Sequence, residues 1–571
     1  MKPLIKTKPF LSQYKKDILS LLIFTITFLT IYLLITQNKY LFASTTDFKY
    51  QHYLIPEYFR TLFYSTHELF PDFALNLGSG QNIYYLSYYG LYNPFILLSY
   101  LFPNVQIIDY LITTNCLIVL TRFYFYLRKN NYNEKTSFIT AFLFLTSGPL
   151  IFHAKRHIMF INYFPFLILG LFGIDSYFKK KNITLLTISI SLIILTSYYF
   201  SIPSLIMLFL YSIYKYFKET KYITIKSMLK FYLKIAIPFL LGIMITSILT
   251  ISTLYTLING RTKSIITTTL KDLLIPSLTK NFFYSPYSIG LTLISLLALL
   301  HFTFKGKKET KYLAITCLLI SLFPIFNFIL NGTLYINAKS LIPFSPLILL
   351  LVAKFLSPYL KSKINKKQLL ILSYLTISSF LICLYINHTD KLMTKTEINN
   401  PTYNTVNQLI NEITSKDKTF YRINTNILKE STINKVTNIH EYKTTIYSSA
   451  SNQYYKTSYN NIIKNPVPNR NKFMFSPSNN LISQTLLNEK YIITKDNLSP
   501  NLKLIKEQNN VKLYLNQNDL PLGYATNQLI SLNQYQKISY PNNIITLLNN
   551  IIINDNTIPK KEITNLTKKR P

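Results

Sequence analysis

The chain has 571 residues, of which 49% are hydrophobic, and its formal net charge is +37. Its mean hydropathy is +0.21, and apolar runs of about twenty residues recur, which is the length that crosses a hydrocarbon core of roughly 30 Å. These features exclude an ordinary soluble protein and indicate a multi-pass membrane protein. The positive charge does not indicate a nucleic-acid partner, because no basic helix or RNA-binding motif stands apart from the apolar runs.

The first apolar run, residues 18–36, follows several lysines and has no small-residue cleavage site, so we expect an uncleaved first span. A long loop rich in polar and aromatic residues follows, over residues 37–106. The later apolar runs predict further spans, which gives about eleven in all. These runs are centred near Leu117, Phe144, Ile168, Ile190, Met207, Ile243, Ile294, Leu319, Leu349 and Leu375.

The apolar stretch of residues 184–217 is too long for one span and is interrupted by the sequence SYYFSIPS. Pro203, with the polar Ser197, Ser201 and Ser204 around it, favours the tip of a hairpin between two spans, because proline disrupts a helix interior. The alternative is a single tilted, kinked helix, which would invert every later loop. The lysines that follow the stretch favour the hairpin.

The charges between the apolar runs indicate the orientation of the chain, because cytoplasmic loops are enriched in lysine and arginine. We expect the N-terminus and the lysine-rich loops to face the cytoplasm. Those loops contain Arg128, Lys129 and Lys135; Lys179–Lys181; Lys215–Lys230; Lys305, Lys307 and Lys308; and Lys361–Lys367. The opposite set then faces outward, as residues 37–106, 153–158, 259–285 and 331–340. An odd number of spans places the C-terminal region outside as well.

The composition changes near residue 388, where polar residues replace the apolar runs. The segment VNQLINEI has helical spacing, whereas KTFYRIN, EKYIITK and VKLYLNQ have the character of strands, with EQNN as a turn. We therefore expect residues 1–387 to form a membrane domain and residues 388–548 to form a small mixed α/β domain outside the cytoplasm. The tail, residues 549–571, is expected to be weakly ordered.

The outward loops carry a mixed set of ionisable residues, in contrast to the simple lysine clusters of the other loops. The segment HAKRH joins two spans by a very short loop and places up to four cationic groups at the membrane boundary. One interpretation is that these side chains extend toward lipid headgroups. The other is a site for the phosphate of a lipid-linked substrate, since arginine can donate two parallel hydrogen bonds and lysine supplies a point charge. The candidate substrate-binding cations are His153, Lys155, Arg156 and His157, followed by Arg60, Arg261 and Lys339.

Asp47 is the candidate catalytic residue. A carboxylate in a loop is usually only solvated, but Asp47 follows the first span closely, among aromatic residues, and on the same side as the cationic segment. There it can deprotonate an acceptor hydroxyl while the cations hold a phosphate leaving group. Glu57 and Asp72 are second candidates, and Glu57 is also a candidate substrate-binding residue. A pair of carboxylates can also hold a divalent metal, although nothing in their spacing indicates one.

The segment NLGSGQN, residues 76–82, offers Gly78 and Gly80 for a tight backbone turn. It is too short to be a nucleotide-binding fingerprint, and it lies too far from any strand–helix unit. We therefore expect this segment to shape the backbone of the first loop.

Several segments, in their order along the chain, resemble the bacterial YfhO family of multi-pass membrane proteins. The first are TTDFKYQHYLIPEYFR, FPDFALNLGSGQNIYYLSYYGLYNPFILLSYLFP and TSGPLIFHAKRHIMFINYFPFLILG. The resemblance continues through TSYYFSIPSLIMLFLY and NGTLYINAKSLIPFSPLILL, and later through FYRIN, YSSASNQYYKTSYNN, NEKYIIT and VKLYLNQNDLPLGYATN. It therefore covers most of the chain.

The resemblance implies a GT-C-type glycosyltransferase fold and a role in the glycosylation of cell-envelope polymers such as lipoteichoic acid. Enzymes of this fold typically take a sugar from a polyprenyl-phosphate donor outside the membrane. They carry a key acidic residue in the first outer loop, and Asp47 is the matching position. Family members usually have a larger outer domain followed by a closing span, and this chain ends without one, which implies a short member or a truncated reading frame.

We therefore expect a mainly α, polytopic membrane glycosyltransferase that transfers a sugar from a polyprenyl-phosphate-linked donor to an envelope polymer on the outer face. The alternatives are a lipid or polysaccharide transporter, and a non-catalytic scaffold whose outer domain binds envelope polymer. Transporters usually carry functional charged groups near the middle of the membrane. The span centres here are nearly free of charge, which favours chemistry at the membrane surface.

Overall fold

The structure is a computed structural model in which the chain forms two compact units. The membrane unit comprises Met1–Arg60, Tyr84–Tyr255 and Thr262–Ile398, and the C-terminal unit comprises Thr61–Ile83, Thr256–Arg261 and Asn399–Pro571. The structure describes residues 10–69, 71–103, 107–260, 269–276, 284–333, 336–360, 365–398, 400–425, 427, 433–450, 452–463, 473–474, 481–523, 525–539 and 541–553.

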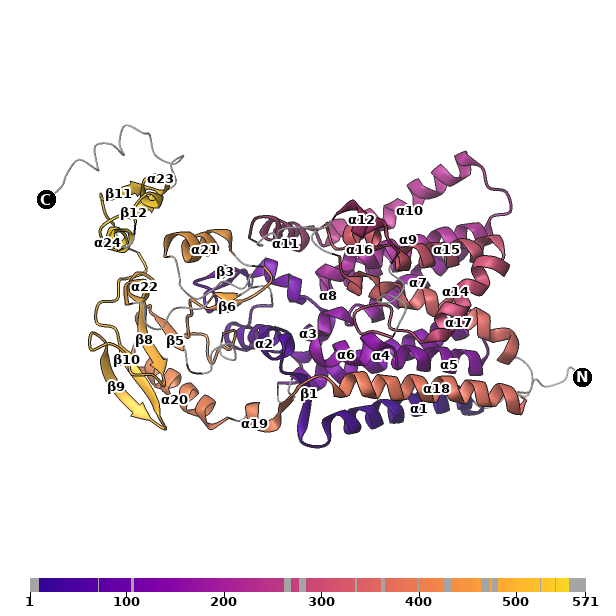
Figure 1. Ribbon diagram of the computed structural model, residues 1–571, viewed down its shortest axis with the longest axis horizontal. Helices are drawn as coiled ribbons and strands as arrows, with labels where there is room; N and C mark the ends of the chain where they lie inside the picture. The colour runs from indigo at the N-terminus through magenta and orange to yellow at the C-terminus, as the bar shows by residue number, and fades with distance from the viewer. Residues whose placement is uncertain are drawn as a thin grey trace, which may run out of the picture. The chain divides into compact units, whose positions relative to one another are not determined.

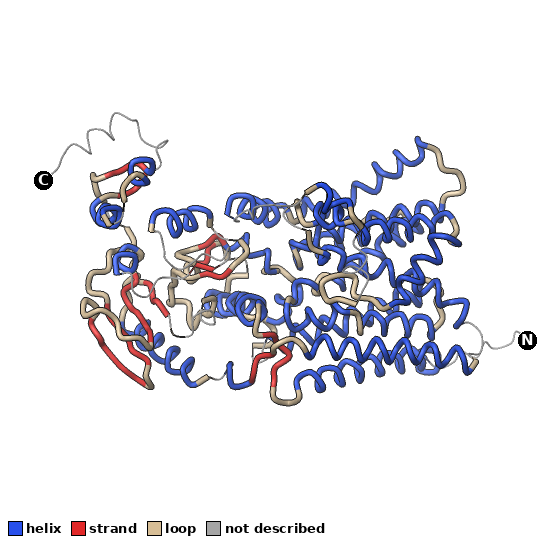
Figure 2. Tube along the Cα trace, viewed as in Figure 1, coloured by secondary structure: helices blue, strands red, loops and turns tan. Residues whose placement is uncertain are grey.

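The membrane unit consists mainly of helices, many of which run side by side (Figures 1 and 2). Its longer helices are α1 (Phe10–Thr36), α2 (Leu54–Thr66), α4 (Ile107–Lys129), α5 (Glu134–Leu145), α6 (Gly148–Arg156), α7 (Phe164–Lys180), α8 (Thr184–Thr196), α9 (Tyr198–Glu219), α10 (Ile225–Ile245), α11 (Ser247–Gly260), α14 (Leu293–Lys305), α15 (Lys308–Leu322), α17 (Ser345–Leu360) and α18 (Lys366–His388). Its short helices are η1 (Phe48–His52), η2 (Ile83–Tyr89), α3 (Pro94–Ser99), η3 (Ile158–Phe160), α12 (Leu270–Leu274), α16 (Pro324–Leu330), η4 (Ala338–Phe344) and α19 (Lys395–Ile398).

Six helices in the described part of the chain are long and apolar enough to cross a membrane. They are Lys15–Thr36, Ile158–Lys180, Tyr198–Glu219, Ile225–Ile245, Ala338–Leu360 and Lys366–His388. Two bent pairs, α5 with α6 and α15 with α16, raise the number to eight if each pair is one span. This is fewer than the eleven or so that the apolar runs predicted. Part of the difference lies in α8 and α14, which contain the expected centres Ile190 and Ile294 but have only 13 residues each.

The long apolar stretch forms two helices, and the break between them lies at Ser197 rather than at Pro203. Ser197 has an extended backbone between α8 and α9, and Pro203 lies inside α9. Helix α8 starts just after the end of α7. The far end of α9 lies near the same end of α7, as the 3.0 Å contact between Lys215 Nζ of α9 and Asp175 Oδ1 of α7 shows. The stretch is therefore a hairpin, as predicted, with its tip moved by several residues.

Loops that were predicted to share the cytoplasmic side meet at one end of the membrane unit, which we call the lysine-rich end. Side-chain contacts join the start of α1, the α4–α5 turn and the ends of α7, α9 and α17. These contacts are Arg128 Nε to Asp17 Oδ1 (2.9 Å), Asn130 Nδ2 to Asp175 Oδ2 (3.2 Å), Lys215 Nζ to Asp175 Oδ1 (3.0 Å) and Asn133 Nδ2 to the Leu360 carbonyl (3.0 Å). That this end faces the cytoplasm stays a prediction.

A short antiparallel strand pair joins the start of the long first loop to the segment after α18. Strand β1 (Tyr40–Ser44) pairs with β4 (Leu392–Thr394), and the Thr45 N–H donates to the Lys391 carbonyl at 3.0 Å. The pairing brings the residues just after β1 next to those just before β4, although almost the whole membrane unit separates them in sequence.

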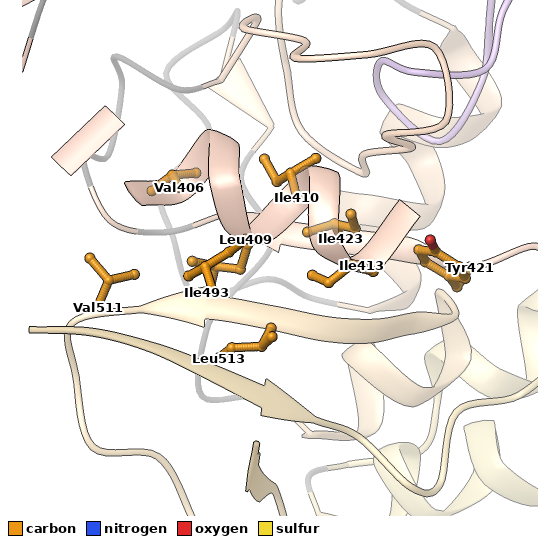
Figure 3. Packing of buried hydrophobic residues seen from close by; sticks show 9 residues of the cluster. All are labelled: Val406, Leu409, Ile410, Ile413, Tyr421, Ile423, Ile493, Val511 and Leu513. Atoms are coloured by element: carbon orange, nitrogen blue, oxygen red, sulfur yellow. The ribbon is translucent and has the colours of Figure 1, made fainter. Parts of the chain in front are cut away.

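The C-terminal unit contains a small mixed sheet covered by one long helix. The sheet has the order β5-β8-β10-β9, with β5 and β8 parallel and the other pairs antiparallel. Helix α20 (Pro401–Lys416) packs on it, and Val406, Leu409 and Ile413 of this helix meet Ile493 and Leu513 of the sheet (Figure 3). The strands are β5 (Arg422–Thr425), β8 (Glu489–Thr494), β9 (Lys503–Gln508) and β10 (Val511–Leu515). The predicted helix, the three predicted strands and the EQNN turn are thus confirmed.

The remaining elements of the C-terminal unit are short. They are β2 (Phe73–Ala74), β3 (Gln81–Asn82), β6 (Ile446–Tyr447), α21 (Gln453–Thr457), η6 (Ser458–Ile462), β7 (Phe473–Met474), α22 (Leu481–Leu486), β11 (Leu529–Ser531), α23 (Leu532–Gln536), α24 (Asn542–Asn549) and β12 (Ile551–Ile553). Most of the expected weakly ordered tail, residues 549–571, lies outside the described residues. The assignment of residues 388–548 to a domain outside the cytoplasm stays a prediction.

The NLGSGQN segment belongs to the C-terminal unit, where it forms a tight turn. The backbone N–H groups of Gly78 and Ser79 donate to the carbonyls of Thr445 and Lys443. Gly78 has a φ of +53°, and a Cβ there would lie 2.7 Å from Gln81 Nε2. Both the left-handed backbone and the close approach therefore favour glycine at this position.

Candidate active site

Asp47 and the HAKRH segment lie side by side, although 110 residues separate Asp47 from His157 in sequence. His157 Nε2 is 2.9 Å from Asp47 Oδ2. Asp47 comes just before η1, and His157 lies at the break between α6 and η3. The Asp47 side chain is 36% exposed and that of His157 is 10% exposed, so the carboxylate reaches solvent while the imidazole is enclosed. We call this end of the membrane unit the Asp47 end.

A chain of hydrogen bonds continues from His157 into the protein. His157 Nδ1 lies 3.2 Å from His153 Nδ1, and His153 Nε2 lies 2.7 Å from the Pro286 carbonyl oxygen. The carbonyl can only accept, so His153 donates from Nε2. Each of the three links from Asp47 to Pro286 needs one hydrogen, and two neutral imidazoles supply two. All three links are hydrogen bonds at the same time only when the chain holds a third proton, one more than an ionised Asp47 with two neutral histidines.

Burial opposes the uptake of such an extra proton by His157. Burial lowers the pKa of His157, and the hydrogen bond and charge of Asp47 act against that change. The positive charges of Arg156 and Lys339 lower the pKa of His157 further. An imidazolium at His157 is therefore disfavoured.

Asp390 binds both cations of the HAKRH segment. Lys155 Nζ lies 2.6 Å from Asp390 Oδ2, and Arg156 Nη1 lies 2.7 Å from Asp390 Oδ1. Ser44 Oγ donates to the same carboxylate at 3.2 Å. The side chains of Lys155 and Asp390 are 0% and 2% exposed, whereas that of Arg156 is 25% exposed. Arg156 is thus the cation of this cluster that keeps an accessible surface.

Asp390 is absent from the candidates that the sequence indicated. The sequence did contain a feature that could have identified Asp390. Asp390 lies just after the last apolar run, as Asp47 lies after the first. The strand pair β1–β4 explains their proximity: Asp390 lies two residues before β4, and Asp47 lies three residues after β1. A pairing between two such short strands leaves no mark in the local sequence.

Aromatic rings connect Lys339 to the histidine chain. The Phe160 ring stacks on His157 with centroids 4.8 Å apart, and Tyr199 lies next to Phe160. Lys339 Nζ lies 4.5 Å from the Tyr199 ring centroid and 5.7 Å from that of Phe160, which is within the range of cation–π attraction. His153 and His157 also contact the ring of Tyr287.

The other sequence-based candidates occupy different surroundings. Arg60 is buried and donates to Glu57 Oε2 at 3.2 Å and to the Phe102 carbonyl at 3.0 Å. Burial raises the pKa of Glu57, and the charge of Arg60 opposes the rise. Asp72 is exposed in the C-terminal unit. Arg261 lies outside the described residues. Among the described residues, no group of three or more His, Cys, Asp or Glu side chains is arranged to hold a metal ion.

A family model described as bacterial membrane protein YfhO matches residues 18–328 and 281–570 of the chain. The chain belongs to the YfhO family. It is therefore a bacterial multi-pass membrane protein, in agreement with the resemblance of its segments. No curated protein matches this YfhO-family chain.

Two solved structures are similar to this YfhO-family chain. Arabinofuranosyltransferase AftD from Mycobacteria is 11% identical with a TM-score of 0.54, and the match covers 87% of this chain and 42% of AftD. ArnT from Cupriavidus metallidurans, crystallised with undecaprenyl phosphate, is 9% identical with a TM-score of 0.44, and the match covers 88% of this chain and 99% of ArnT. The likeness to AftD shows a GT-C-type fold, as expected, and the chain spans less than half of AftD's length.

Proposed function

We propose that this YfhO-family chain is a glycosyltransferase that moves a sugar from a polyprenyl-phosphate-linked donor to an envelope polymer such as lipoteichoic acid. The observation that carries the proposal is the 2.9 Å contact between His157 Nε2 and Asp47 Oδ2. It joins a carboxylate–imidazole pair to a cationic segment at one end of a GT-C-type fold. The donor and the acceptor follow from the family resemblance.

In the proposed reaction, the oxygen of an acceptor hydroxyl forms a bond to the anomeric carbon of the sugar. The bond from that carbon to the phosphate oxygen breaks, and its electron pair leaves with the polyprenyl phosphate. The hydroxyl proton passes to Asp47, which can accept it only when the histidine chain holds no third proton. His157 then donates from Nε2 and orients the carboxylate. A base in this role contributes about 10²–10⁴ in rate.

The leaving phosphate is held in this proposal by Arg156 and Lys339. Arg156 uses Nη1 to bind Asp390, and its planar guanidinium has further donors for phosphate oxygens. Lys155 is enclosed and its charge is matched by Asp390, so its role is to position that carboxylate and, through it, Arg156. His153 contacts the His157 nitrogen that faces away from Asp47 and so orients the His157 ring.

The experiment is mass spectrometry of envelope polymers from a deletion strain complemented with variants of the full chain. The wild type and Glu68→Gln are expected to restore the sugar substituent, because Glu68 is an exposed carboxylate of the same loop. Asp47→Asn is expected not to restore it, at equal protein level in the membrane. An unchanged sugar content in the deletion strain would overturn the function. If Asp47→Asn restored the sugar substituent, the proposed function would still hold, but Asp47 would not be its catalytic residue.

A further inference from the structure

A small polar pocket lies at the lysine-rich end of the membrane unit. Helix α7 begins near His157 and carries Asp175 close to this pocket, so about 18 Å of helix, from Phe164 to Asp175, separates the pocket from the Asp47 end. The pocket has a volume of about 50 Å³. Its polar lining comes from α4 and the turn after it, from α9 and from α17, and includes Asn130, Tyr132, Tyr214, Lys215, Lys218 and Lys354.

One part of the lining is an internally matched network. Asp175 accepts hydrogen bonds from Tyr211 Oη at 3.0 Å and from Asn130 Nδ2 at 3.2 Å, and Lys215 Nζ lies 3.0 Å from the same carboxylate. Tyr126 Oη lies 2.5 Å from Tyr211 Oη. Asp175 and Lys215 are both about 5% exposed. The polar groups on this side of the pocket therefore have partners within the protein.

The other part of the lining offers donors that have no acceptor in the described part of the chain. Neither the hydroxyls of Tyr132 and Tyr214 nor the ammonium of Lys218 has a protein partner there. Lys354 Nζ donates to Thr310 Oγ1 and has further hydrogens to donate. Two carboxylates lie nearby: Glu219 is 3.7 Å from Lys215, and Glu309 acts on Lys354 only electrostatically. Lys218 and Lys354 thus keep charge for a ligand.

The ligand that fits this lining carries negative charge and several hydrogen-bond acceptors on a small group. A volume of about 50 Å³ corresponds to roughly three to five water molecules at about 10–15 Å³ each. That is room for a phosphoryl group. Basic pockets between membrane helices commonly bind lipid headgroups.

We propose that this pocket binds a phosphate group, supplied either by the headgroup of an anionic phospholipid or by free phosphate. Lys218 and Lys354 supply the charge, and the hydroxyls of Tyr132 and Tyr214 donate to the remaining oxygens. The site is separate from the proposed glycosyltransferase centre and does not depend on that activity.

The experiment measures ligand binding by the full chain purified in an uncharged detergent. Native mass spectrometry counts bound phosphatidylglycerol, with a phosphate-free, uncharged glycolipid as the comparison. A thermal unfolding series with inorganic phosphate forms the second arm. The test variants are Lys218→Gln and Tyr214→Phe, and Lys221→Gln removes an exposed lysine outside the pocket as the matched control. Tyr214→Phe deletes a single oxygen, so it preserves the packing of α9.

Each test variant is expected to weaken phosphate-group binding by about tenfold, the usual consequence of losing one charge-assisted contact. Lys221→Gln is expected to bind like the wild type. Saturable binding in the lipid arm alone identifies a headgroup site, and saturable binding in the inorganic arm alone identifies a free-phosphate site; both support the proposal. No saturable binding in either arm, or binding that Lys218→Gln and Tyr214→Phe leave unchanged, would overturn it.

Discussion

The two aspartates at the Asp47 end have opposite surroundings. Asp47 is partly exposed and contacts an enclosed imidazole, whereas Asp390 is enclosed and contacts two cations. A carboxylate that reaches solvent can exchange a proton with an incoming hydroxyl, and one whose oxygens bind two cations is held in place. Under the proposed function, the surroundings therefore distinguish a proton-accepting carboxylate from a positioning one.

A substitution of His153 is expected to change the pH dependence of the proposed reaction. With His153→Phe, the chain of hydrogen bonds that starts at Asp47 ends at His157. The single hydrogen of one neutral imidazole then forms its only remaining link. The third proton is then no longer needed, so the loss of activity on acidification should move to lower pH. The measurement is transfer rate against pH for both proteins. An acid limb at the same pH in both would contradict the proton count, whatever the maximal rate.

Substitution of Asp390 is expected to destabilise the membrane unit. Asp390→Asn leaves the ammonium of Lys155 enclosed without a counter-charge, and breaking such a buried pair from one side typically costs about 3–5 kcal/mol. The double variant Lys155→Met with Asp390→Leu removes both charges and should recover much of the loss. Thermal unfolding in detergent compares the three proteins. A single variant as stable as the wild type would show that the pair contributes nothing to folding.

At the scale of elements, periodicity predicted local structure well and long-range pairing not at all. Helix α20 and strands β5, β8 and β10 follow from the spacing of apolar residues. The β1–β4 pair cannot be predicted in this way, because two strands of five and three residues meet across the sequence of the membrane unit. Asp47 and the HAKRH cations were found by residue type and position, but Asp390 required knowledge of that pairing. The tip of the α8–α9 hairpin was displaced because α9 accommodates Pro203.

The tight turn at Gly78 is expected to be essential for packing in the C-terminal unit. Gly78→Ala should destabilise this unit by about 1–3 kcal/mol, because the added Cβ meets the side chains of Gln81 and Ile446 and the backbone is left-handed. Gly332→Ala is the matched control, since Gly332 also has a positive φ but open space around it. Rates of limited proteolysis at the C-terminal unit report the difference. Equal protease resistance of the two variants would show that the close approach at Gly78 is unimportant.

At the scale of the whole molecule, the membrane unit has two chemically distinct ends. Lysine-rich loops and the phosphate-sized pocket share one end, and the histidine chain with its two aspartates occupies the other. The positive-inside preference then predicts which end faces the cytoplasm.

Cysteine labelling from outside intact cells tests this orientation in a background without native cysteines. Lys503→Cys, on an exposed strand of the C-terminal unit, is expected to react with an impermeant reagent. Lys307→Cys, in the exposed α14–α15 turn, is expected to react only after the membrane is permeabilised. The reverse pattern would invert the predicted topology.

The hydrogen-bond chain that starts at Asp47 ends at a backbone carbonyl. His153 donates to the Pro286 carbonyl, and a carbonyl oxygen can hold a hydrogen bond but cannot release a proton of its own. A proton taken from an acceptor at Asp47 must therefore return to the water on the side from which it came. Under the proposed function, turnover moves no charge across the bilayer, so dissipating the transmembrane proton gradient at constant external pH should leave the rate of sugar transfer unchanged.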